Sequence, residues 1–417
     1  MSEEALTVQG KLSFEWAKSH MPVLSLAQQY VRKKIGRRLF VGLDLAACLH
    51  VSKETSVLIS LLHSLGLKIR LVAANPLSSQ SEVVSFLTSI GVDVRAKRGE
   101  SANEYQSEIS GAANSQPDLI VDDGGDLHVA YSRTRSNSCF GGTDETTSGT
   151  TRLAALERSS KLRYPAIPVN EARTKHLFDN RYGTGQSAID GLVRATGLLL
   201  AGKTLVVCGY GRVGKGVSER GRGHGARIII TEVDPIKALE AKLDGFEVLQ
   251  MNDAAKVGDI FLTCTGQINV INSRHFGLFK DGAILGNVGH FNQEIDARAL
   301  LRSGIAAEQV RKGIAKVKMS DSKSIYLLDQ GRVVNLISAE GHPPEIMQLS
   351  FANQLLSIHY LISHRKELAR SKRKLLEFPK SIDEMVSKFA IEGFGLQIDK
   401  LTRKQNQYAR SFVRVSA

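Results

Sequence analysis

Lys175 and Asp179 are the residues whose types and spacing point most directly to chemistry. They lie four positions apart, Asn180 follows directly, and a helix would place the lysine and the aspartate on one face. On an exposed face they would form an ion pair that contributes about a few tenths of a kcal/mol. In an enclosed site, neighbouring groups can adjust the pKa of a lysine for proton transfer, which would make the pair an acid–base centre.

Acidic residues follow a predicted strand at residues 118–122. Asp122, Asp123 and Asp126 lie in the sequence Val-Asp-Asp-Gly-Gly-Asp, which begins at Val121. Because open α/β sheets bind ligands beyond the carboxyl ends of their strands, these carboxylates are candidates for a base or a metal ligand. They can also simply cap turns. No metal is predicted, and the dispersed cysteines form no C-x-x-C pair.

A second polar cluster occupies residues 142–149. Glu145 can accept a hydrogen bond from a sugar hydroxyl, and the hydroxyls of Thr146, Thr147 and Ser148 can bind phosphate or ribose. Taken alone, the same residue types also fit a surface loop that caps the next helix.

Three histidines lie near these clusters in the predicted architecture. His50 and His290 each follow a predicted strand, and His342 lies in the loop Ala339–Pro343. A single histidine is more often structural than catalytic. Three of them on the side where such sheets bind ligands favour a functional role.

A glycine-rich turn lies between two apolar segments. Gly209 permits a tight turn, Gly211 lets the backbone approach a pyrophosphate at a helix N-terminus, and Gly214 lets the helix pack closely on the strand. Glu232 ends the next apolar segment and is placed to accept hydrogen bonds from ribose hydroxyls, which favours NAD over NADP. The turn therefore predicts a bound dinucleotide.

Strands and helices are predicted to alternate around these residues, as in parallel sheets with helices on both faces. Strands are predicted over 39–45, 68–74, 92–96, 118–122, 204–208, 227–231, 259–265 and 283–287. Helices are predicted over 53–65, 80–90, 187–200 (stopped by Gly202) and 350–368 (after a chain break at Pro343 and Pro344), and 132–148 is predicted to be loop.

This order predicts an α/β protein with two doubly wound parallel-sheet domains. A Rossmann-type NAD domain (186–343) is inserted into an α/β substrate domain (1–185 and 344–375), and a small tail (376–417) is expected at a subunit interface. The chain crosses between the domains twice, which is a hinge arrangement. The cleft between them is therefore the predicted active site.

The composition is that of an ordinary globular protein, with 42% hydrophobic and 23% charged residues in a chain of 417. No apolar run approaches the roughly 20 residues that span a bilayer, and no signal pattern opens the chain. We expect a cytoplasmic protein with no membrane partner. The net charge of +13, concentrated at 32–38 and 365–374, is compatible with nucleic-acid binding. Neither run contains interleaved aromatics, so we favour solvated faces or interface edges and predict no nucleic-acid partner.

Together these segments resemble the S-adenosylhomocysteine hydrolase family. The similarity extends from Phe14 to Tyr408, and its most specific motifs are Lys175–Ser187 (KHLFDNRYGTGQS) and Gly341-His-Pro-Pro followed by Ser-Phe-Ala-Asn-Gln at 350–354. The resemblance implies an enzyme that splits S-adenosylhomocysteine reversibly into adenosine and homocysteine. Tightly held NAD oxidises the ribose 3′-hydroxyl, homocysteine is eliminated after loss of the acidified 4′ proton, water adds, and the ketone is reduced again.

The resemblance also implies roles for the candidate residues. Lys175 and Asp179 match groups that handle the 3′-hydroxyl, Asp123 the acid given the 4′ proton, and His50 the acid/base near the 5′ carbon. Glu145 matches a sugar-hydroxyl acceptor, Asn180 and His290 match residues that place the nicotinamide, and His342, Ser52 and Glu54 match the adenine side. The implied NAD contacts are Thr146, Thr147, Ser148, Asn180, Gly209, Gly211, Arg212, Val213, Gly214, Gly216, Glu232, Lys237, Asn287, Val288, Gly289, His290, Asn335 and His342.

The sequence departs from the family pattern at three places. Lys237 stands where many relatives have Asn beside the adenosine ribose, Thr184 replaces a cysteine of animal-type members, and the Lys- and Tyr-bearing extension of longer members does not follow. The pattern is similar to the compact, archaeal-type form, and we expect a homotetramer.

Three alternative functions follow from the same pattern. S-inosylhomocysteine can be the substrate of the same mechanism, although Glu54 as an acceptor favours an amino group. A catalytically silent regulatory relative would be expected to lack some of the acid–base groups, all of which are present. An ordinary NAD dehydrogenase would export its hydride and accumulate NADH.

Overall fold

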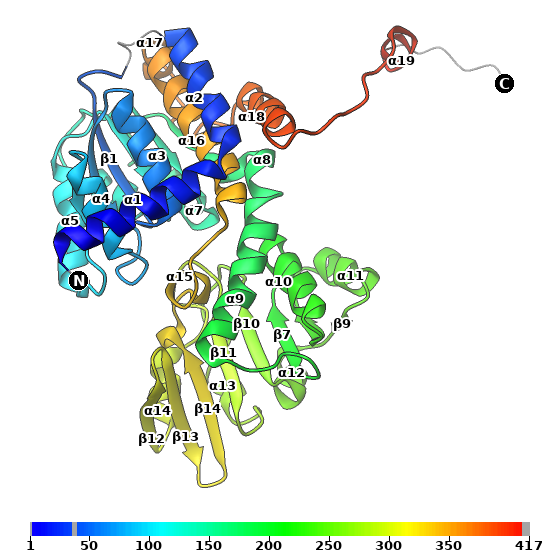
Figure 1. Cartoon of the computed structure of the whole chain (residues 1–417). Helices are drawn as coiled ribbons and strands as arrows, with labels where there is room; N and C mark the ends of the chain where they lie inside the picture. The colour runs from blue at the N-terminus through cyan, green and yellow to red at the C-terminus, as the bar shows by residue number, and fades with distance from the viewer. Residues whose placement is uncertain (1, 36–39, 411–417) are drawn as a thin grey trace.

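The protein consists of two α/β bodies joined by two links, as the computed structural model shows for residues 2–35 and 40–410 (Figure 1). The first body is built on a six-stranded sheet and the second on an eight-stranded sheet. Within the described residues, no helix combines the length and apolarity needed to cross a membrane.

The sheet of the first body is entirely parallel, in the order β3-β2-β1-β4-β5-β6. Its strands are β1 (Asp44–Leu49), β2 (Lys68–Ala73), β3 (Asp93–Arg95), β4 (Leu119–Asp122), β5 (Gly141–Asp144) and β6 (Ala166–Pro168). The strand order reverses between β1 and β4, and such a switch point opens a crevice beyond the carboxyl ends of the two strands. His50 directly follows β1, and Asp123 directly follows β4.

Helices cover both faces of this sheet, as expected for a doubly wound fold. One buried cluster joins the sheet to α1 (Glu3–Ser19), α2 (Pro22–Ile35), α3 (Lys53–Ser64), α4 (Ser81–Ser89), α16 (Pro344–Ser363) and α18 (Lys380–Gly393). The other joins it to α5 (Ala102–Asn114), α6 (Asp126–Arg133) and α7 (Thr147–Arg158).

The second body repeats the same strand order and then extends it. Its strands are β7 (Thr204–Cys208), β8 (Arg227–Thr231), β9 (Glu247–Val248), β10 (Ile260–Thr263), β11 (Ala283–Asn287), β12 (Ala306–Arg311), β13 (Ile314–Ser320) and β14 (Lys323–Leu328). The order is β12-β13-β14-β11-β10-β7-β8-β9, parallel except that β13 is antiparallel to both of its neighbours, β12 and β14. The switch point falls between β7 and β10, so the glycine-rich turn after β7 opens into the crevice.

The helices of the second body also form two layers. Buried side chains join the sheet to α9 (Thr184–Thr196), α10 (Arg212–Gly223), α11 (Pro235–Leu243) and α15 (Val334–Ile337) on one face. On the other face lie α12 (Met251–Val257), α13 (Ser273–Phe276) and α14 (Ala297–Ser303).

The two links carry much of the predicted chemistry. The first runs through the 3₁₀ turn η2 (Val169–Glu171), α8 (Arg173–His176) and the π-helical turn η3 (Asp179–Gly183) into α9. The second runs from the 3₁₀ turn η4 (Asp329–Gly331) through α15 into α16. The domain boundaries at residues 185, 343 and 375 stay a prediction.

The prediction of a loop over residues 132–148 was wrong, because this stretch contains β5 and the start of α7. The strand Gly-Gly-Thr-Asp carries no apolar side chain that would identify it, yet it is fully buried. A Cβ at Gly142 would lie 2.8 Å from Tyr164 and 2.9 Å from His128, and one at Gly141 would lie 3.1 Å from Leu361. Neighbouring side chains therefore fill the space that the strand's own side chains leave.

Two predicted helix ends were wrong. The helix predicted to stop at Gly202 ends at Thr196, because Gly197 adopts the left-handed conformation (φ 69°) that caps helices. The helix predicted over 350–368 begins at Pro344 and ends at Ser363, with α17 (Arg365–Ala369) after it. The prolines start α16 instead of breaking the chain, since a proline in the first turn loses no helical hydrogen bond.

Two strand predictions also needed correction. The first strand, predicted over 39–45, is β1 at Asp44–Leu49, and Leu39 lies outside the described residues. The strands β12 to β14 were not predicted, since every residue of β12 is exposed and lacks the apolar pattern of a core strand. They extend a sheet that was expected to be wholly parallel.

The C-terminal tail divides into a packed helix and an extended segment. Ile382 and Val386 of α18 are buried against the first body, where α18 contacts α2 and α16. The chain then leads away to α19 (Arg403–Tyr408), which stands apart from both bodies and buries no residue (Figure 1). The last residues of the basic run 32–38 lie outside the described part of the chain.

Candidate active site

Lys175 stands at the centre of a buried cluster on the first link. Its Nζ lies 3.0 Å from Asp179 Oδ2, 3.7 Å from Glu145 Oε1, and donates to Asn180 Oδ1 at 2.8 Å. Only 3% of the lysine side chain is exposed. Burial disfavours its charge, but Asp179 and Glu145 outweigh this effect and raise the pKa of Lys175. The pair is therefore an enclosed charged centre and not a surface ion pair.

The backbone around this centre is not the continuous helix that the spacing suggested. Lys175 lies on the single turn α8, and Asp179 begins the π-helical turn η3. Such turns often occur at functional sites. Asn170, which the sequence did not single out, accepts from Asn180 Nδ2 at 3.0 Å and fixes the orientation of that amide.

His342 ties the second link to the first. Its Nδ1 lies 2.5 Å from Asp179 Oδ1, and its Nε2 lies 3.2 Å from Asn335 Nδ2 and 3.3 Å from Thr184 Oγ1. Burial disfavours the charged forms of both His342 and Asp179. Their mutual attraction nevertheless raises the pKa of His342. The same attraction, together with that of Lys175, lowers the pKa of Asp179. Asp179 is thus held ionised between Lys175 and His342.

Glu145 faces the same centre from the end of β5. Burial raises its pKa to about 7, Lys175 opposes that shift, and Asp179 adds to it. Gln354 of α16 donates to Glu145 Oε2 at 2.6 Å, whereas Oε1 has no hydrogen-bond partner among the described residues. Gln354 lies in the motif at 350–354 that suggested the family, but its contact with Glu145 was not predicted.

A second cluster forms where the two bodies meet. Asp123 Oδ2 lies 3.7 Å from His50 Nε2, and Asp123 Oδ1 lies 4.0 Å from His290 Nδ1. Ser78, which was not predicted, lies 2.7 Å from His50 Nδ1. Burial, the largest effect on both histidines, lowers the pKa of His50 and His290 to about 4. Both rings are therefore neutral near pH 7.

Gly124 makes this meeting of the bodies possible. Its φ of +108° is open to glycine, and a Cβ there would lie 2.2 Å from His290 Nε2. The close approach leaves Asp123 Oδ1 buried without a hydrogen-bond partner among the described residues. A buried acceptor without a hydrogen-bond partner raises the free energy of the folded protein unless a ligand donates a hydrogen bond to it.

The other two acids of the cluster at 122–126 are engaged in hydrogen bonds within the first body. Asp122 accepts from the backbone N–H groups of Asp123 and His128, each at 2.9 Å. Asp126 pairs with Arg152 at 2.5 Å and accepts from Tyr105 at 2.8 Å. Of the three acids, Asp123 is the one that lies beside His50 and His290.

Ser52 and Glu54 form a separate group at the start of α3. Ser52 caps this helix and donates to Glu54 Oε2 at 2.8 Å. Lys53 Nζ lies 3.2 Å from Glu54 and 2.8 Å from Glu340 at the end of the second link. Burial raises the pKa of Glu54, and Lys53 opposes that shift.

The glycine-rich turn has the shape that a dinucleotide requires. A Cβ at Gly214 would lie 1.9 Å from the carbonyl oxygen of Gly209, so the helix packs directly on the turn. No atom lies within 4 Å of the Cβ position of Gly211, which leaves room beside the N-terminus of α10, where Arg212 and Val213 begin the helix. The residues fit NAD on this observation.

The acid at the end of β8 is held in place by the backbone. Glu232 accepts from the N–H groups of Tyr210 (2.7 Å), Val233 (2.7 Å) and Asp234 (3.0 Å). Lys237 Nζ lies 3.4 Å from Asp234 Oδ2. The carboxylate is therefore fixed at the strand end, where ribose hydroxyls are expected.

Further predicted NAD contacts lie at the end of β11, in the turn after it, and in α15. Asn287 Oδ1 accepts from Gly289 N at 2.8 Å, and Asn287 Nδ2 donates to the carbonyls of Gly289 and Phe291, which shapes the turn that carries Val288 and His290. Asn335 Nδ2 donates to Ser187 at 3.2 Å.

Two further contacts surround the acid–base centre, and the second brings α10 against it. Thr147 accepts from Asn170 Nδ2 at 3.1 Å, while Thr146 caps α7 and lies 3.0 Å from Ser148. A Cβ at Gly216 would lie 1.8 Å from the carbonyl oxygen of Arg181, so α10 packs directly on η3.

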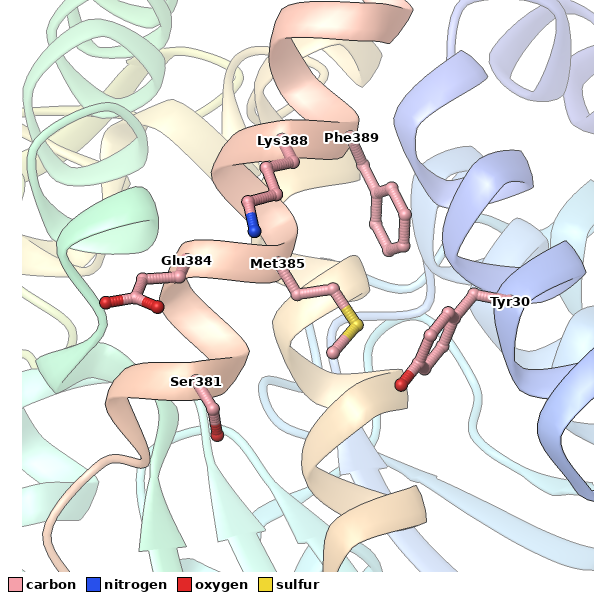
Figure 2. A pocket seen from close by; sticks show the side chains of 6 residues that line it. All are labelled: Tyr30, Ser381, Glu384, Met385, Lys388 and Phe389. Carbon is pink, nitrogen blue, oxygen red and sulfur yellow. The ribbon is translucent and has the colours of Figure 1, made fainter. Parts of the chain in front are cut away.

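A cavity away from this junction contains none of the predicted site residues. It has a volume of about 440 Å³, lies between α2 and α18, and is lined by Tyr30, Met385 and Phe389 among others (Figure 2). Its apolar lining belongs to the packing of the tail helix on the first body.

The fold and the site define a class of protein: a two-body α/β enzyme in which a dinucleotide-binding body and a second body share an acid–base centre. Residues 2–139 match the family profile described as S-adenosyl-L-homocysteine hydrolase. Residues 180–341 match the profile described as S-adenosyl-L-homocysteine hydrolase, NAD binding domain.

Full-length relatives extend this match over almost the whole chain. The adenosylhomocysteinase of Aeropyrum pernix is 46% identical over 411 residues, 98% of this chain and 97% of that protein. Those of Sulfurisphaera tokodaii (46% over 410 residues) and Aquifex aeolicus (45% over 413 residues) cover the same shares. The chain therefore belongs to the S-adenosyl-L-homocysteine hydrolase family and is an NAD-dependent enzyme, which confirms the resemblance.

Proposed function

We propose that the junction between the two bodies catalyses the reversible hydrolysis of S-adenosyl-L-homocysteine to adenosine and L-homocysteine. The observation that carries the proposal is the enclosure of Lys175 by Asp179, Glu145 and Asn180. A lysine held in this way keeps its proton at a fixed position beside an acceptor, as proton transfer to and from a sugar hydroxyl requires.

NAD bound at the glycine-rich turn would supply reversible hydride transfer at the 3′ carbon of the sugar, so that the net reaction is hydrolysis. The N-terminus of α10 would hold its pyrophosphate and Glu232 its ribose hydroxyls. Asn180 and the turn at 287–290 would place the nicotinamide end beside the substrate. The contact of α10 with η3 supports this placement.

Lys175 and Asp179 handle the proton of the 3′-hydroxyl. Glu145 accepts a hydrogen bond from a sugar hydroxyl through Oε1, which has no hydrogen-bond partner among the described residues. Asp123 removes the 4′ proton, which the neighbouring 3′ ketone makes acidic. His50, neutral because burial lowers its pKa to about 4, exchanges a proton with the sulfur or the water at the 5′ carbon. His342 keeps Asp179 oriented from the adenine side.

NAD-loaded protein is expected to release a free thiol and adenosine from S-adenosylhomocysteine without net formation of NADH. A thiol reagent and chromatography of the nucleoside measure both products. Absence of thiol release would exclude the hydrolase, and would favour the silent regulatory relative. Stoichiometric NADH without thiol would point to a dehydrogenase.

Glu54 is proposed to select the base of the nucleoside. An ionised Glu54 accepts from the amino group of adenine, whereas a protonated Glu54 would donate to the carbonyl of hypoxanthine. We expect kcat/KM for the adenosyl substrate to exceed that for the inosyl substrate by about tenfold or more, since a buried acceptor left unpaired is costly. Glu54→Gln should reduce this ratio, and Glu340→Gln, which alters the other partner of Lys53, should leave it unchanged. A ratio below one in the wild type would assign the inosyl substrate.

The pH dependence should follow Glu145. Its pKa is raised to about 7, so the acceptor form exists above that pH and is lost as the pH falls below it. We expect kcat/KM to fall by about tenfold for each pH unit below 7. The pKa values of His50 and His290 are about 4, so these histidines cannot cause a fall in kcat/KM just below pH 7.

Glu145→Gln provides the control for this assignment, because burial also raises the pKa of the nearby Asp122 to about 7. The variant should be slower but flat between pH 5.5 and 7.5. If it keeps the same limb as the wild type, the limb belongs to another group.

We also propose a homotetramer in the cytoplasm, with no nucleic-acid or membrane partner. Apolar side chains are exposed along α11 and the tail, such as Ile236 (77%), Leu243 (79%), Ile398 (67%) and Leu401 (64%), and burial between subunits would cover them. Free cysteines are consistent with a reducing compartment. Light scattering should give about four chains of 45.5 kDa, and deletion of residues 396–417 should lower that number. A monomeric full-length chain would contradict the proposal.

A further inference from the structure

A cavity of about 480 Å³ lies between the two bodies, apart from every group assigned above to catalysis or NAD. Leu77 and Arg98 line it from the first body. Arg311 and Lys312, at the tip of the β12–β13 hairpin, line it from the second. Arg194 of α9 and Asp329 of η4 close it from the links.

The lining carries more positive charge than the protein itself neutralises. Arg194 is paired with Asp190 at 2.9 Å and lies 3.9 Å from Glu340. In contrast, Arg98 and Arg311 donate only to backbone carbonyls, those of Ile337 (3.5 Å) and Thr196 (3.2 Å). Within the described residues, no carboxylate lies within 4 Å of Arg98, Arg311 or Lys312.

The single acid of the cavity is already engaged. Asp329 is buried, accepts from the hydroxyl of Ser338 at 2.7 Å, and its pKa is raised to about 6 by burial. A Cβ at Gly313, whose φ is +77°, would lie 2.6 Å from Asp329 Oδ1. The hairpin tip is therefore fixed against Asp329, with its two cations at the cavity.

Backbone strain marks the same place. Asp329 (φ 45°) and Gln330 (φ 57°) are consecutive residues in the left-handed region, which non-glycine residues rarely adopt. Such conformations persist only where the surrounding structure imposes them, and they concentrate at functional sites. The strained turn lies at the start of the second link, next to the hinge.

We propose that this inter-domain cavity binds a compact phosphoryl anion, such as a pyrophosphate-type group, through Arg98, Arg311 and Lys312. Guanidinium groups match the oxygens of phosphate in paired hydrogen bonds, and cations from both bodies converge here. No aromatic side chain lines the cavity, so nothing in it would stack on a nucleotide base. This site would also account for part of the net charge of +13.

A ligand that contacts both bodies binds best to one of their relative positions and therefore shifts the population of that arrangement. The proposed site would thus couple an anion to opening and closing of the catalytic cleft. This regulation goes beyond the proposed reaction, and binding can be measured without turnover.

The test is a titration of NAD-loaded, full-length protein with inorganic pyrophosphate, balanced with potassium chloride to constant ionic strength and followed by calorimetry and thermal unfolding. Loaded NAD keeps the glycine-rich turn occupied. We expect saturable binding with one site per chain, and at least tenfold weaker binding in Arg311→Gln/Lys312→Gln and in Arg98→Gln. All three side chains are exposed, so the variants should fold.

The matched control is Lys366→Gln/Lys372→Gln, which removes the same charge from exposed positions of the first body. It should bind like the wild type. Equal weakening in the control, or binding without saturation, would show general charge screening and overturn the site. Tighter binding of ATP than of pyrophosphate would overturn the assignment to a compact anion. If the Arg98, Arg311 and Lys312 variants lose pyrophosphate binding but release thiol at the wild-type rate, the anion site is supported and the proposed reaction is unaffected.

Discussion

Replacement of Lys175 by methionine is expected to lower kcat for S-adenosylhomocysteine hydrolysis by about three orders of magnitude, within the range that positioned acid–base groups supply. Methionine fills most of the space but carries no proton. It also leaves Asp179 and Glu145 without the cation that lies 3.0 Å and 3.7 Å from them. Initial rates of thiol release and NADH formation from adenosine measure the effect, and both should fall because the first oxidation is lost.

A second variant separates chemistry from stability, since removing one partner of a buried ion pair is itself destabilising. Lys175→Arg keeps the charge between the two carboxylates but does not release a proton near neutral pH. It should therefore unfold close to the wild-type temperature and yet remain nearly as inactive as Lys175→Met. Lys161→Met, at an exposed position, is the control and should keep full activity. If Lys175→Arg retains more than a tenth of wild-type kcat, the lysine is an electrostatic support and not a proton carrier.

Three strands of the second body could be predicted from sequence because each contains an uninterrupted apolar run. Residues 204–208, 227–231 and 283–287 agree with β7, β8 and β11 at both ends. The strand β5 could not, since its burial comes from Tyr164, His128 and Leu361 and not from its own side chains. A local pattern thus reports a strand only when the strand supplies its own apolar surface.

The same distinction applies to the candidate site. The proximity of His50 and Asp123 followed from two strand ends, because neighbouring parallel strands bring their carboxyl ends to one edge. The residue types alone left Asp122, Asp123 and Asp126 open, and the family resemblance favoured Asp123. In the structure Asp122 caps the next turn. The contacts of Glu145 with Lys175 and Gln354 depend on how both links pack, and no local spacing encodes a contact across 209 residues.

Replacement of Asp123 by asparagine is expected to separate the two halves of the proposed reaction. Asparagine has the same shape but cannot take the 4′ proton, so thiol release should fall by about three orders of magnitude. The 3′ oxidation uses Lys175 and Asp179 and should continue, so that adenosine still reduces the bound cofactor in a single turnover. Absorbance of the reduced nicotinamide follows the first half, and exchange of the 4′ hydrogen with deuterium oxide, read by NMR, follows the second.

Asp126→Asn is the matched control, since this neighbouring acid already pairs with Arg152 and accepts from Tyr105. It should exchange the 4′ hydrogen within a few-fold of the wild-type rate. Because Asp123 Oδ1 has no partner among the described residues, its replacement removes no internal hydrogen bond at that oxygen. Loss of activity in Asp123→Asn then reports chemistry and not unfolding. Normal 4′ exchange in this variant would transfer the role to His50 or His290, the only other predicted site residues within 4.0 Å of the Asp123 carboxylate.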